Sequence, residues 1–174
     1  MYLLQSTEKN KLNVQLLASG PILNEAIEAS KILKQDWNIS SDVWSVTSYS
    51  ELYREAENVE RNNKLNPENE EKKTYIENCL NDNDPVIAVS DYVKLVSEQI
   101  SPYIKSDFTS LGTDGFGRSD TRERLREFFE INRFYIVISS INSLLKMKKI
   151  DKKILVKALK KYNIDISKEN PFQR

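Results

Sequence analysis

The chain has 174 residues, of which 39% are hydrophobic and 30% are charged, the composition of an ordinary globular domain. Its 26 basic and 26 acidic residues give a formal net charge of zero, which argues against partners attracted by overall charge, such as nucleic acid or an anionic membrane. The chain contains no histidine, and this absence excludes a Ser-His-Asp triad, a Cys-His pair and histidine-containing zinc sites.

The first part of the chain predicts strands that alternate with helices. Residues 14–18 form a short apolar run typical of a buried strand. The first twenty residues as a whole lack the long apolar core of a secretion signal. Apolar residues at helical spacing predict a helix over residues 22–35. Strand-forming residues predict a second strand over residues 42–47, and a short helical pattern follows at residues 51–53.

The middle of the chain changes character. Residues 57–72 are almost entirely polar and include Pro67, which predicts a surface excursion from a single domain spanning residues 1–174. Residues 75–80 can form another short helix. This helix carries Cys79, the only cysteine, so no disulfide can form within the chain and the predicted location is the reducing cytoplasm.

The second half continues the alternation. Residues 86–89 are the clearest buried strand, residues 108–111 predict a fourth strand, and Asp91 is expected to cap a helix between them. The residues that this helix is expected to present are Tyr92, Leu95, Val96 and Gln99. Apolar spacing predicts a helix over residues 131–145 and a last helix after Asp151. No apolar run reaches the roughly 18 residues of a membrane span. This alternation predicts a mostly parallel sheet covered on both faces.

Three of the four glycines lie close together, at Gly112, Gly115 and Gly117, between the fourth strand and a charged helix. A glycine-rich turn before a helix can bind phosphate, because glycine permits the positive φ angles that aim N–H groups inward. However, Asp120 is expected to be the N-cap of the helix, with Glu123 in a box-like arrangement, and such a cap occupies those N–H groups. The turn also matches neither a P-loop nor a dinucleotide fingerprint. We therefore favour a structural turn over a phosphate site.

The same turn is a candidate subunit contact, because Phe116 and Arg118 are expected to project from it. The predicted turn or interface residues are Asp114, Gly115, Phe116, Gly117, Arg118, Ser119 and Asp120. The helix behind the turn is expected to expose its charged residues, Arg126 included, and to bury Leu125, Phe128 and Phe129. Gly117→Val is expected to damage folding or assembly, because the turn is predicted to need a positive φ there.

A basic patch lies between the last two predicted helices and comprises Lys146, Lys148, Lys149, Lys152 and Lys153. We interpret the patch as a solvated junction, with docking of a partner's acidic face as the alternative. Two further functional classes therefore stay open on the residues alone. One is a free-standing α/β module that binds a small anion or nucleotide at the Gly115–Gly117 turn, and the other is a protein-interaction domain.

Several stretches, taken in order along the chain, resemble one family. They are VQLLASGPILNEAI, SDVWSVTSYSEL, PVIAVSDYVKLVSEQISPYI, TDGFGRSDTRERLREFFE and IDKKILVKALKKYNIDISKENP. Together they resemble the C-terminal domain of the homodimeric bacterial pyruvate dehydrogenase first components, over nearly the whole chain. The resemblance implies a transketolase C-terminal-like α/β fold with three α/β/α layers and a mixed, mostly parallel five-stranded sheet. The residues themselves predict only four strands, so the fifth is expected near the polar excursion or after the glycine turn.

The resemblance also implies an oxidoreductase as the parent enzyme. That enzyme decarboxylates pyruvate on thiamine diphosphate with magnesium and reductively acetylates the lipoyl group of the acyltransferase component. The cofactors lie between two preceding domains of a homodimer, so no catalytic, cofactor-binding or metal-binding residue is carried over to this chain. The isolated segment is expected to be inactive and to bind no cofactor. Its implied partners are the preceding thiamine-binding domains, the second subunit and, through the parent, the acyltransferase component.

Overall fold

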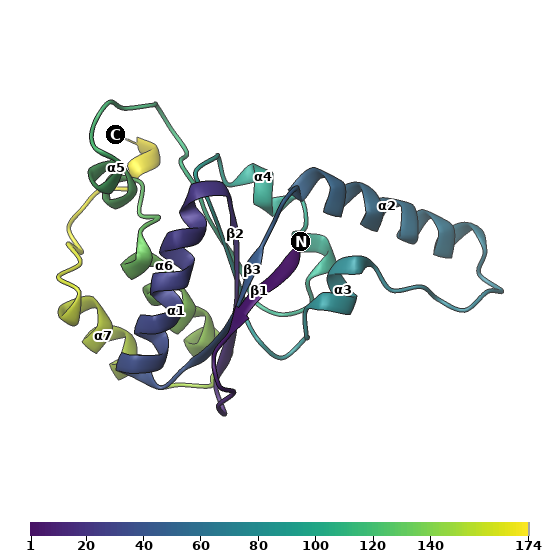
Figure 1. Cartoon of the computed structure of the whole chain (residues 1–174), viewed down its shortest axis with the longest axis horizontal. Coiled ribbons are helices and arrows are strands. Elements are labelled where there is room, and N and C mark those ends of the chain that lie inside the picture. Colours follow the sequence, from purple (N-terminus) through teal and green to yellow (C-terminus); the bar gives the residue numbers. More distant parts are fainter. Residues whose placement is uncertain (174) are drawn as a thin grey trace.

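The computed structural model describes residues 1–173 and shows a five-stranded sheet between two layers of helices (Figure 1). The strands are β1 (Tyr2–Ser6), β2 (Asn13–Ser19), β3 (Ser40–Ser45), β4 (Val86–Ser90) and β5 (Phe108–Leu111). They lie in the order β1-β3-β2-β4-β5, with β1 antiparallel to β3 and the other neighbours parallel. The predicted mixed, mostly parallel five-stranded sheet is therefore confirmed.

The fifth strand, β1, lies at the N-terminus, so its expected place near the polar excursion or after the glycine turn is wrong. β1 forms one edge of the sheet, and its register with β3 shifts between Leu3 and Gln5. The sequence YLLQS does not alternate between apolar and polar residues, and most of the strand is exposed. A short, exposed edge strand leaves no periodic signal from which it could be recognised.

One face of the sheet is covered by α1 (Leu23–Trp37), α6 (Arg133–Lys146) and α7 (Lys152–Lys161). The core on this face brings Leu16 of β2 together with Leu33 of α1 and Ile141 of α6, all fully buried or nearly so. Asp151 caps α7 by accepting a hydrogen bond from the Lys153 N–H at 2.7 Å. These three helices match the helices expected from apolar periodicity.

The opposite face is covered by α2 (Tyr49–Leu65), α3 (Tyr75–Cys79) and α4 (Leu95–Glu98). Its core joins Leu17 of β2 to Leu52 of α2 and Ile76 of α3. Because successive strand residues point to opposite faces, β2 supplies Leu16 to one core and Leu17 to the other. The central strand therefore holds both helical layers together.

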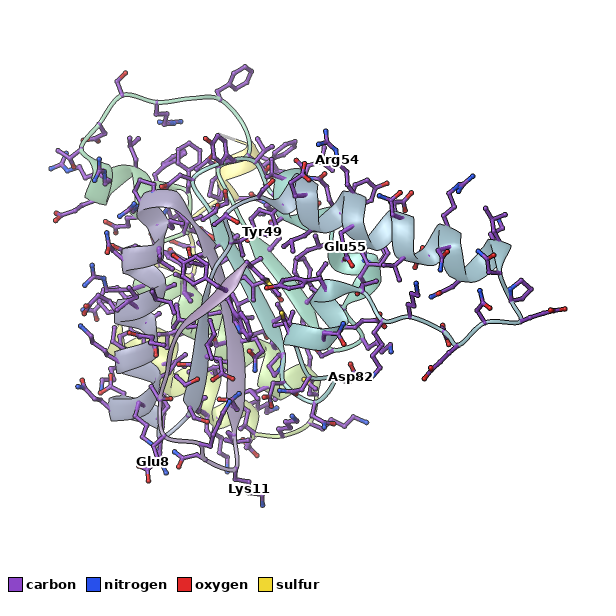
Figure 2. The ribbon with its side chains drawn as sticks, turned by 45° about the vertical axis from the view of Figure 1, so that its right-hand side comes forward. Glu8, Lys11, Tyr49, Arg54, Glu55 and Asp82 are labelled. Carbon is purple, nitrogen blue, oxygen red and sulfur yellow. The ribbon has the colours of Figure 1, made fainter. Side chains whose placement is uncertain are left out.

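Helix α2 runs beyond the edge of the sheet (Figure 1). Its outer part carries mostly polar side chains (Figure 2). The polar segment 57–72 is exposed, as its composition predicts, but it is helical as far as Leu65. The segment after α2 runs back along the helix, and the side chain of Asn63 is hydrogen-bonded to it. Its Nδ2 donates to the Lys72 carbonyl at 2.8 Å, and the Lys72 N–H donates to Asn63 Oδ1 at 3.1 Å.

Helix α4 is shorter than expected, and Asp91 does not cap it. The N-cap position is Lys94, whose N–H donates to Asp114 Oδ1 at 3.1 Å. Tyr92, which was expected on this helix, precedes it and is 67% exposed, and Leu95 is 70% exposed. The helix begins at Leu95 rather than after Asp91, and Ser97 is its buried residue.

The remaining helical elements are short. They are α5 (Arg122–Phe128) and the 3-10 turns η1 (Gly20–Ile22), η2 (Ser101–Tyr103) and η3 (Pro171–Gln173). Within residues 1–173, no helix combines the length and the apolar character needed to cross a membrane.

Candidate functional site

Ligand sites in open α/β sheets usually form beyond the carboxyl ends of the parallel strands, where the strand order reverses. In this sheet β2 has β3 on one side and β4 on the other, so the reversal lies between β2 and β4. The segments that follow these two strands begin with Gly20–Ile22 and with Asp91. The glycine turn follows β5 at the same end of the sheet, which makes this end the candidate site.

The glycine turn, residues 112–120, is fastened to the segment that follows β4. The Thr113 N–H donates to the Tyr92 carbonyl at 2.8 Å. Asp114 accepts the N–H of Lys94 and lies 3.5 Å from the Lys94 Nζ. Asp114 therefore supports the start of α4 rather than the helix that follows its own turn.

The three glycines of the turn have different environments. A Cβ on Gly112 would lie 2.6 Å from the Tyr92 carbonyl oxygen, so this position leaves no room for a side chain. Gly115 has a φ of +95°, in the range that favours glycine. Gly117 has no positive φ, and a Cβ added there would meet no neighbouring atom within 4 Å. The predicted positive φ at Gly117 is wrong, and the expectation for Gly117→Val loses its basis.

Helix α5 is capped by Thr121 and not by Asp120, so the predicted cap is wrong by one residue. Thr121 Oγ1 accepts the Arg124 N–H at 3.4 Å, while Asp120 Oδ1 accepts the N–H of Thr121 at 2.7 Å. Glu123 then stands at the second helical position, where it cannot complete a capping box. The two side chains therefore occupy the N–H groups of Thr121 and Arg124, and the preference for a structural turn over a phosphate site stays a prediction.

The tip of the turn faces solvent. Phe116 is 84% exposed, and Ser119 is also exposed. The guanidinium of Arg118 lies over the Phe128 ring, with its central carbon 4.1 Å from the ring centre. Phe116 thus projects from the domain as expected, and its contact with another subunit stays a prediction.

Buried charges lie behind the turn, and Arg126 is among them rather than on the solvent face as predicted. Arg126 is 8% exposed. Its Nη1 lies 3.3 Å from Glu25 Oε1, and its Nη2 lies 3.5 Å from Asp91 Oδ2. Arg133 binds the same Glu25 more closely, through its Nε at 2.9 Å, its Nη2 at 3.0 Å and its backbone N–H at 2.9 Å.

This cluster changes the acidity of Glu25. Burial by itself raises the pKa of Glu25, but the hydrogen bonds from Arg133 and the nearby charge of Arg126 lower the pKa below its ordinary value. Glu25 stands in the first turn of α1 and Arg133 at the start of α6, so the ion pair joins these two helices. One signal was present in the sequence, because Glu25 falls on the apolar stripe of the predicted helix, three residues after Ile22.

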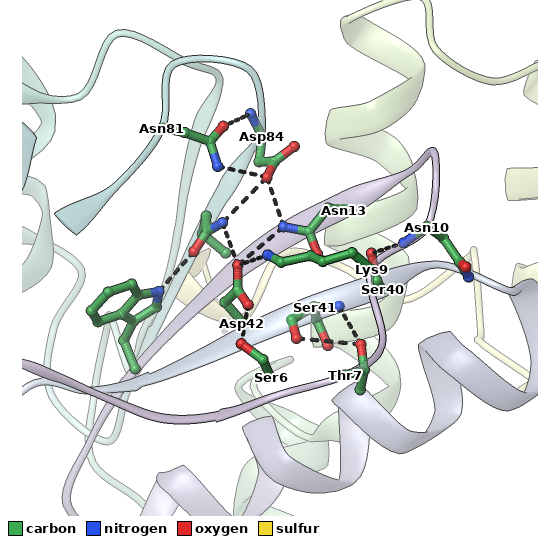
Figure 3. A network of polar contacts seen from close by, with 12 residues as sticks. Ser6, Thr7, Lys9, Asn10, Asn13, Ser40, Ser41, Asp42, Asn81 and Asp84 are labelled. Atoms are coloured by element: carbon green, nitrogen blue, oxygen red, sulfur yellow. Dashed lines mark hydrogen bonds and ion pairs between the residues drawn. The ribbon is translucent and has the colours of Figure 1, made fainter.

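A second polar network lies at the amino ends of the strands (Figure 3). Its centre is the buried carboxylate of Asp42 on β3, which accepts hydrogen bonds from Ser6, Lys9, Asn13 and Gln15. Asn13 Nδ2 also donates to Asp84 Oδ2 at 2.6 Å, and Trp44 Nε1 donates to Gln15 Oε1 at 2.7 Å. The network joins β1, β2, β3 and the segment before β4. Its role is therefore structural.

The five lysines of the predicted basic patch are all exposed. Part of their charge is used within the chain, because Lys146 lies 3.7 Å from Asp107 and Lys149 donates to the carbonyl of Asn83. The described residues contain no group of three or more His, Cys, Asp or Glu side chains arranged to hold a metal ion.

These features define a class of protein, a three-layer α/β/α domain with the architecture found in transketolases. A transketolase from Pichia stipitis, solved with a sedoheptulose 7-phosphate ligand, superposes with a TM-score of 0.58. The superposition covers 86% of this chain and 18% of that one at 17% identity, so it shows the fold alone. The family model of the transketolase-like C-terminal domain matches residues 1–132, and the chain belongs to this family.

Curated relatives extend the match beyond the family model. The pyruvate dehydrogenase E1 component of Pseudomonas aeruginosa is 47% identical over 175 residues, which cover 99% of this chain and 20% of that protein. The pyruvate dehydrogenase E1 component of Escherichia coli K12 is 45% identical over 98% of this chain and 19% of its own length. The resemblance inferred from the sequence motifs is confirmed. The chain spans about one fifth of the length of these relatives.

Proposed function

We propose that this chain serves a cytoplasmic pyruvate dehydrogenase E1 component as its non-catalytic C-terminal domain. The parent would decarboxylate pyruvate on thiamine diphosphate with magnesium and pass the acetyl group to the lipoyl group of the acyltransferase component. Preceding domains would carry that chemistry, and this domain would pack on them and support the homodimer. The observation that carries the proposal is the 47% identity over 99% of the chain.

The surface proposed for this packing lies at the carboxyl end of the parallel strands. Tyr92, Val93 and Leu95 are exposed there, and the hydrogen bonds of the glycine turn place the exposed Phe116 in the adjoining segment. Exposed apolar groups of this kind commonly mark contact sites. Because β1 is antiparallel to β3 and pairs Tyr2 with Ser45, the chain also enters at this end of the sheet. In a parent of the relatives' length, the preceding domains would therefore join the chain at this end of the sheet.

A complementation experiment tests the proposal. The Pseudomonas aeruginosa E1 component is shortened by the segment that matches this chain, and the 174-residue chain is supplied separately. We expect the two pieces to associate and to recover pyruvate oxidation with an artificial electron acceptor, while neither piece is active alone. Isothermal titration of this chain with thiamine diphosphate and magnesium should show no binding. Pyruvate turnover by this chain alone would refute the non-catalytic role.

The docking surface has its own matched comparison. Leu95→Glu is expected to weaken association of the two pieces by about tenfold or more, because it buries an unpaired charge in the contact. Val156→Glu changes another exposed apolar residue, on α7, and should leave association unchanged. Equal association of both variants would reject this surface while leaving the domain assignment in place.

A further inference from the structure

The chain continues beyond α7 as a C-terminal tail, residues 163–173, which carries the 3-10 turn η3. The tail runs from α7 to the loop before α5, so that its end lies beside the glycine turn (Figure 1). A cavity of about 440 Å³ is lined by Ile138 of α6, Leu159 of α7 and, from the tail, Ile164 and Phe172. Part of the tail therefore spans a cavity instead of packing on the core, and the contacts at its far end help to fix its position.

The end of the tail meets the glycine turn at Gly115. A Cβ added to Gly115 would lie 3.4 Å from the Cα of Phe172 and 3.4 Å from the carbonyl oxygen of Pro171, so the two backbones run in contact. Asn170 Oδ1 accepts the Phe172 N–H at 3.0 Å and supports the 3-10 turn that makes this contact. The tail thus holds the residue directly before Phe116.

Lys168 makes a second attachment, on α5. Its Nζ donates to the carbonyl oxygen of Glu127 at 2.6 Å, at the end of the helix where the dipole favours a cation. The same Nζ lies 5.9 Å from the centre of the Phe128 ring, and the guanidinium of Arg118 lies over this ring at 4.1 Å. Phe128 therefore links the tail to the glycine turn on the other side of Phe116.

These attachments bracket Phe116, with Gly115 immediately before it and Arg118 two residues after it. Between them, a Cβ on Gly117 would meet no atom within 4 Å, so close packing at Gly117 does not hold this stretch. An exposed aromatic side chain contributes more to binding when its loop is ordered beforehand, because ordering a mobile loop on binding costs affinity. We propose that the C-terminal tail is a positioning element, which holds Phe116 in the orientation that binds the preceding domains of the parent enzyme.

This inference rests on the function proposed above and takes its binding partner from it. The chain enters at the end of the sheet where β1 pairs Tyr2 with Ser45, and it spans only one fifth of the length of its relatives. The preceding domains are therefore the polypeptide that reaches the glycine turn. Phe172 is itself exposed, so the tail adds an aromatic side chain to the same surface.

The complementation experiment with the shortened Pseudomonas aeruginosa E1 component tests the inference. Lys168→Met removes the ammonium group but keeps the apolar stem, and it should weaken association of the two pieces by about tenfold. The Tm of the isolated chain should change by less than about 2 °C, because Lys168 lies at the periphery of the fold. Lys168→Arg keeps a cation and a donor and should restore association to within about threefold.

Lys157→Met is the matched control, because Lys157 is an exposed lysine on α7, and its association should be unchanged. Unchanged association in Lys168→Met overturns the inference. A large fall in Tm together with the loss of association would also overturn it, because the tail would then stabilise the domain as a whole rather than position the turn.

NMR relaxation of the isolated chain tests the positioning separately from the docking. The backbone order parameters of Phe116 and Gly117 should fall from about 0.8 to below about 0.6 in Lys168→Met and in a variant without residues 168–174. Unchanged order parameters in both variants overturn the inference, even where the unmodified pieces associate. If the unmodified pieces do not associate, the docking proposed above is rejected, and the order parameters still decide whether the tail holds the turn.

Discussion

At Gly112 the chain passes so close to the segment after β4 that a side chain would overlap backbone atoms. An added Cβ would lie 2.6 Å from the Tyr92 carbonyl oxygen and 2.7 Å from the Lys94 nitrogen. Neither atom belongs to a flexible side chain, so the backbone itself would have to move. Gly117 lies in the same turn with open space around it, and the two glycines therefore have opposite tolerance for substitution.

Gly112→Ala is expected to lower the free energy of unfolding by about 1–3 kcal/mol, because overpacking against backbone forces a local shift. Gly117→Ala should change it by less than about 0.5 kcal/mol or raise it slightly, since alanine restricts the unfolded chain. Urea unfolding of both variants measures the difference. Equal effects of the two substitutions would contradict the close approach at Gly112.

At the scale of secondary-structure elements, buried polar groups hold the edge of the sheet. Ser6 on β1 and Lys9 on the turn after it both bond to Asp42 on β3. Figure 3 shows these side chains converging on one carboxylate. Burial by itself raises the pKa of Asp42, but the hydrogen bonds from Lys9, Ser6 and their neighbours lower the pKa below its ordinary value. Edge strand β1, with few apolar contacts, therefore depends on the charge of Asp42.

This dependence predicts acid sensitivity. Because the pKa of Asp42 is lower in the folded chain than in the unfolded chain, its contribution to stability is complete above about pH 4, the unfolded value. The contribution is lost as the pH falls through the lowered folded pKa. Asp42→Asn should lower the free energy of unfolding by about 1–3 kcal/mol at pH 7. The free energy of unfolding of this variant should also fall less steeply as the pH is lowered.

Urea unfolding between pH 7 and pH 2 measures this effect. Asp82→Asn is the control, because Asp82 is an exposed residue on the loop before β4 (Figure 2). It should keep both the stability and the pH dependence of the parent chain. An unchanged acid limb in Asp42→Asn would show that Asp42 does not carry the acid sensitivity.

At the scale of the whole molecule, two cores share one sheet. Trp44 lies in the core under α2, and Trp37 packs on the core under α1 and α7, where its Nε1 donates to the Tyr162 hydroxyl at 2.7 Å. The strands between them contribute side chains to both cores in alternation. Loss of either helical layer would expose one face of the same strands, so the two layers should not unfold independently.

Each tryptophan reports on one layer. In Trp37→Phe the fluorescence of Trp44 follows the α2 side, and in Trp44→Phe the fluorescence of Trp37 follows the α1 side. Within each variant, the denaturant midpoint from fluorescence should coincide with the midpoint from circular dichroism, as in two-state unfolding. A fluorescence midpoint that separates from the circular dichroism midpoint would show that one layer unfolds first.

The sequence alone predicted the elements whose burial is regular. Strands buried on both faces, such as β4, leave continuous apolar runs, and helices such as α6 repeat their apolar residues at helical spacing. The expected number of strands, five, came from the resemblance to the family, whereas periodicity predicted only four. The expected location of β1 was wrong because an exposed edge strand has no regular burial to detect.

The candidate site depended on contacts that no local pattern contains. Arg126 is buried against Glu25, which lies 101 residues earlier in the sequence. Arg133 bonds to the same Glu25, 108 residues earlier in the sequence. Asp114 was predicted only as a residue of the turn or of an interface, and its bond to Lys94, in the segment after β4, was not foreseen. The sequence by itself determined the order and type of the main elements, since these follow from short-range periodicity. Only the tertiary structure decided which charges are buried, because burial of a charge depends on partners that folding brings together.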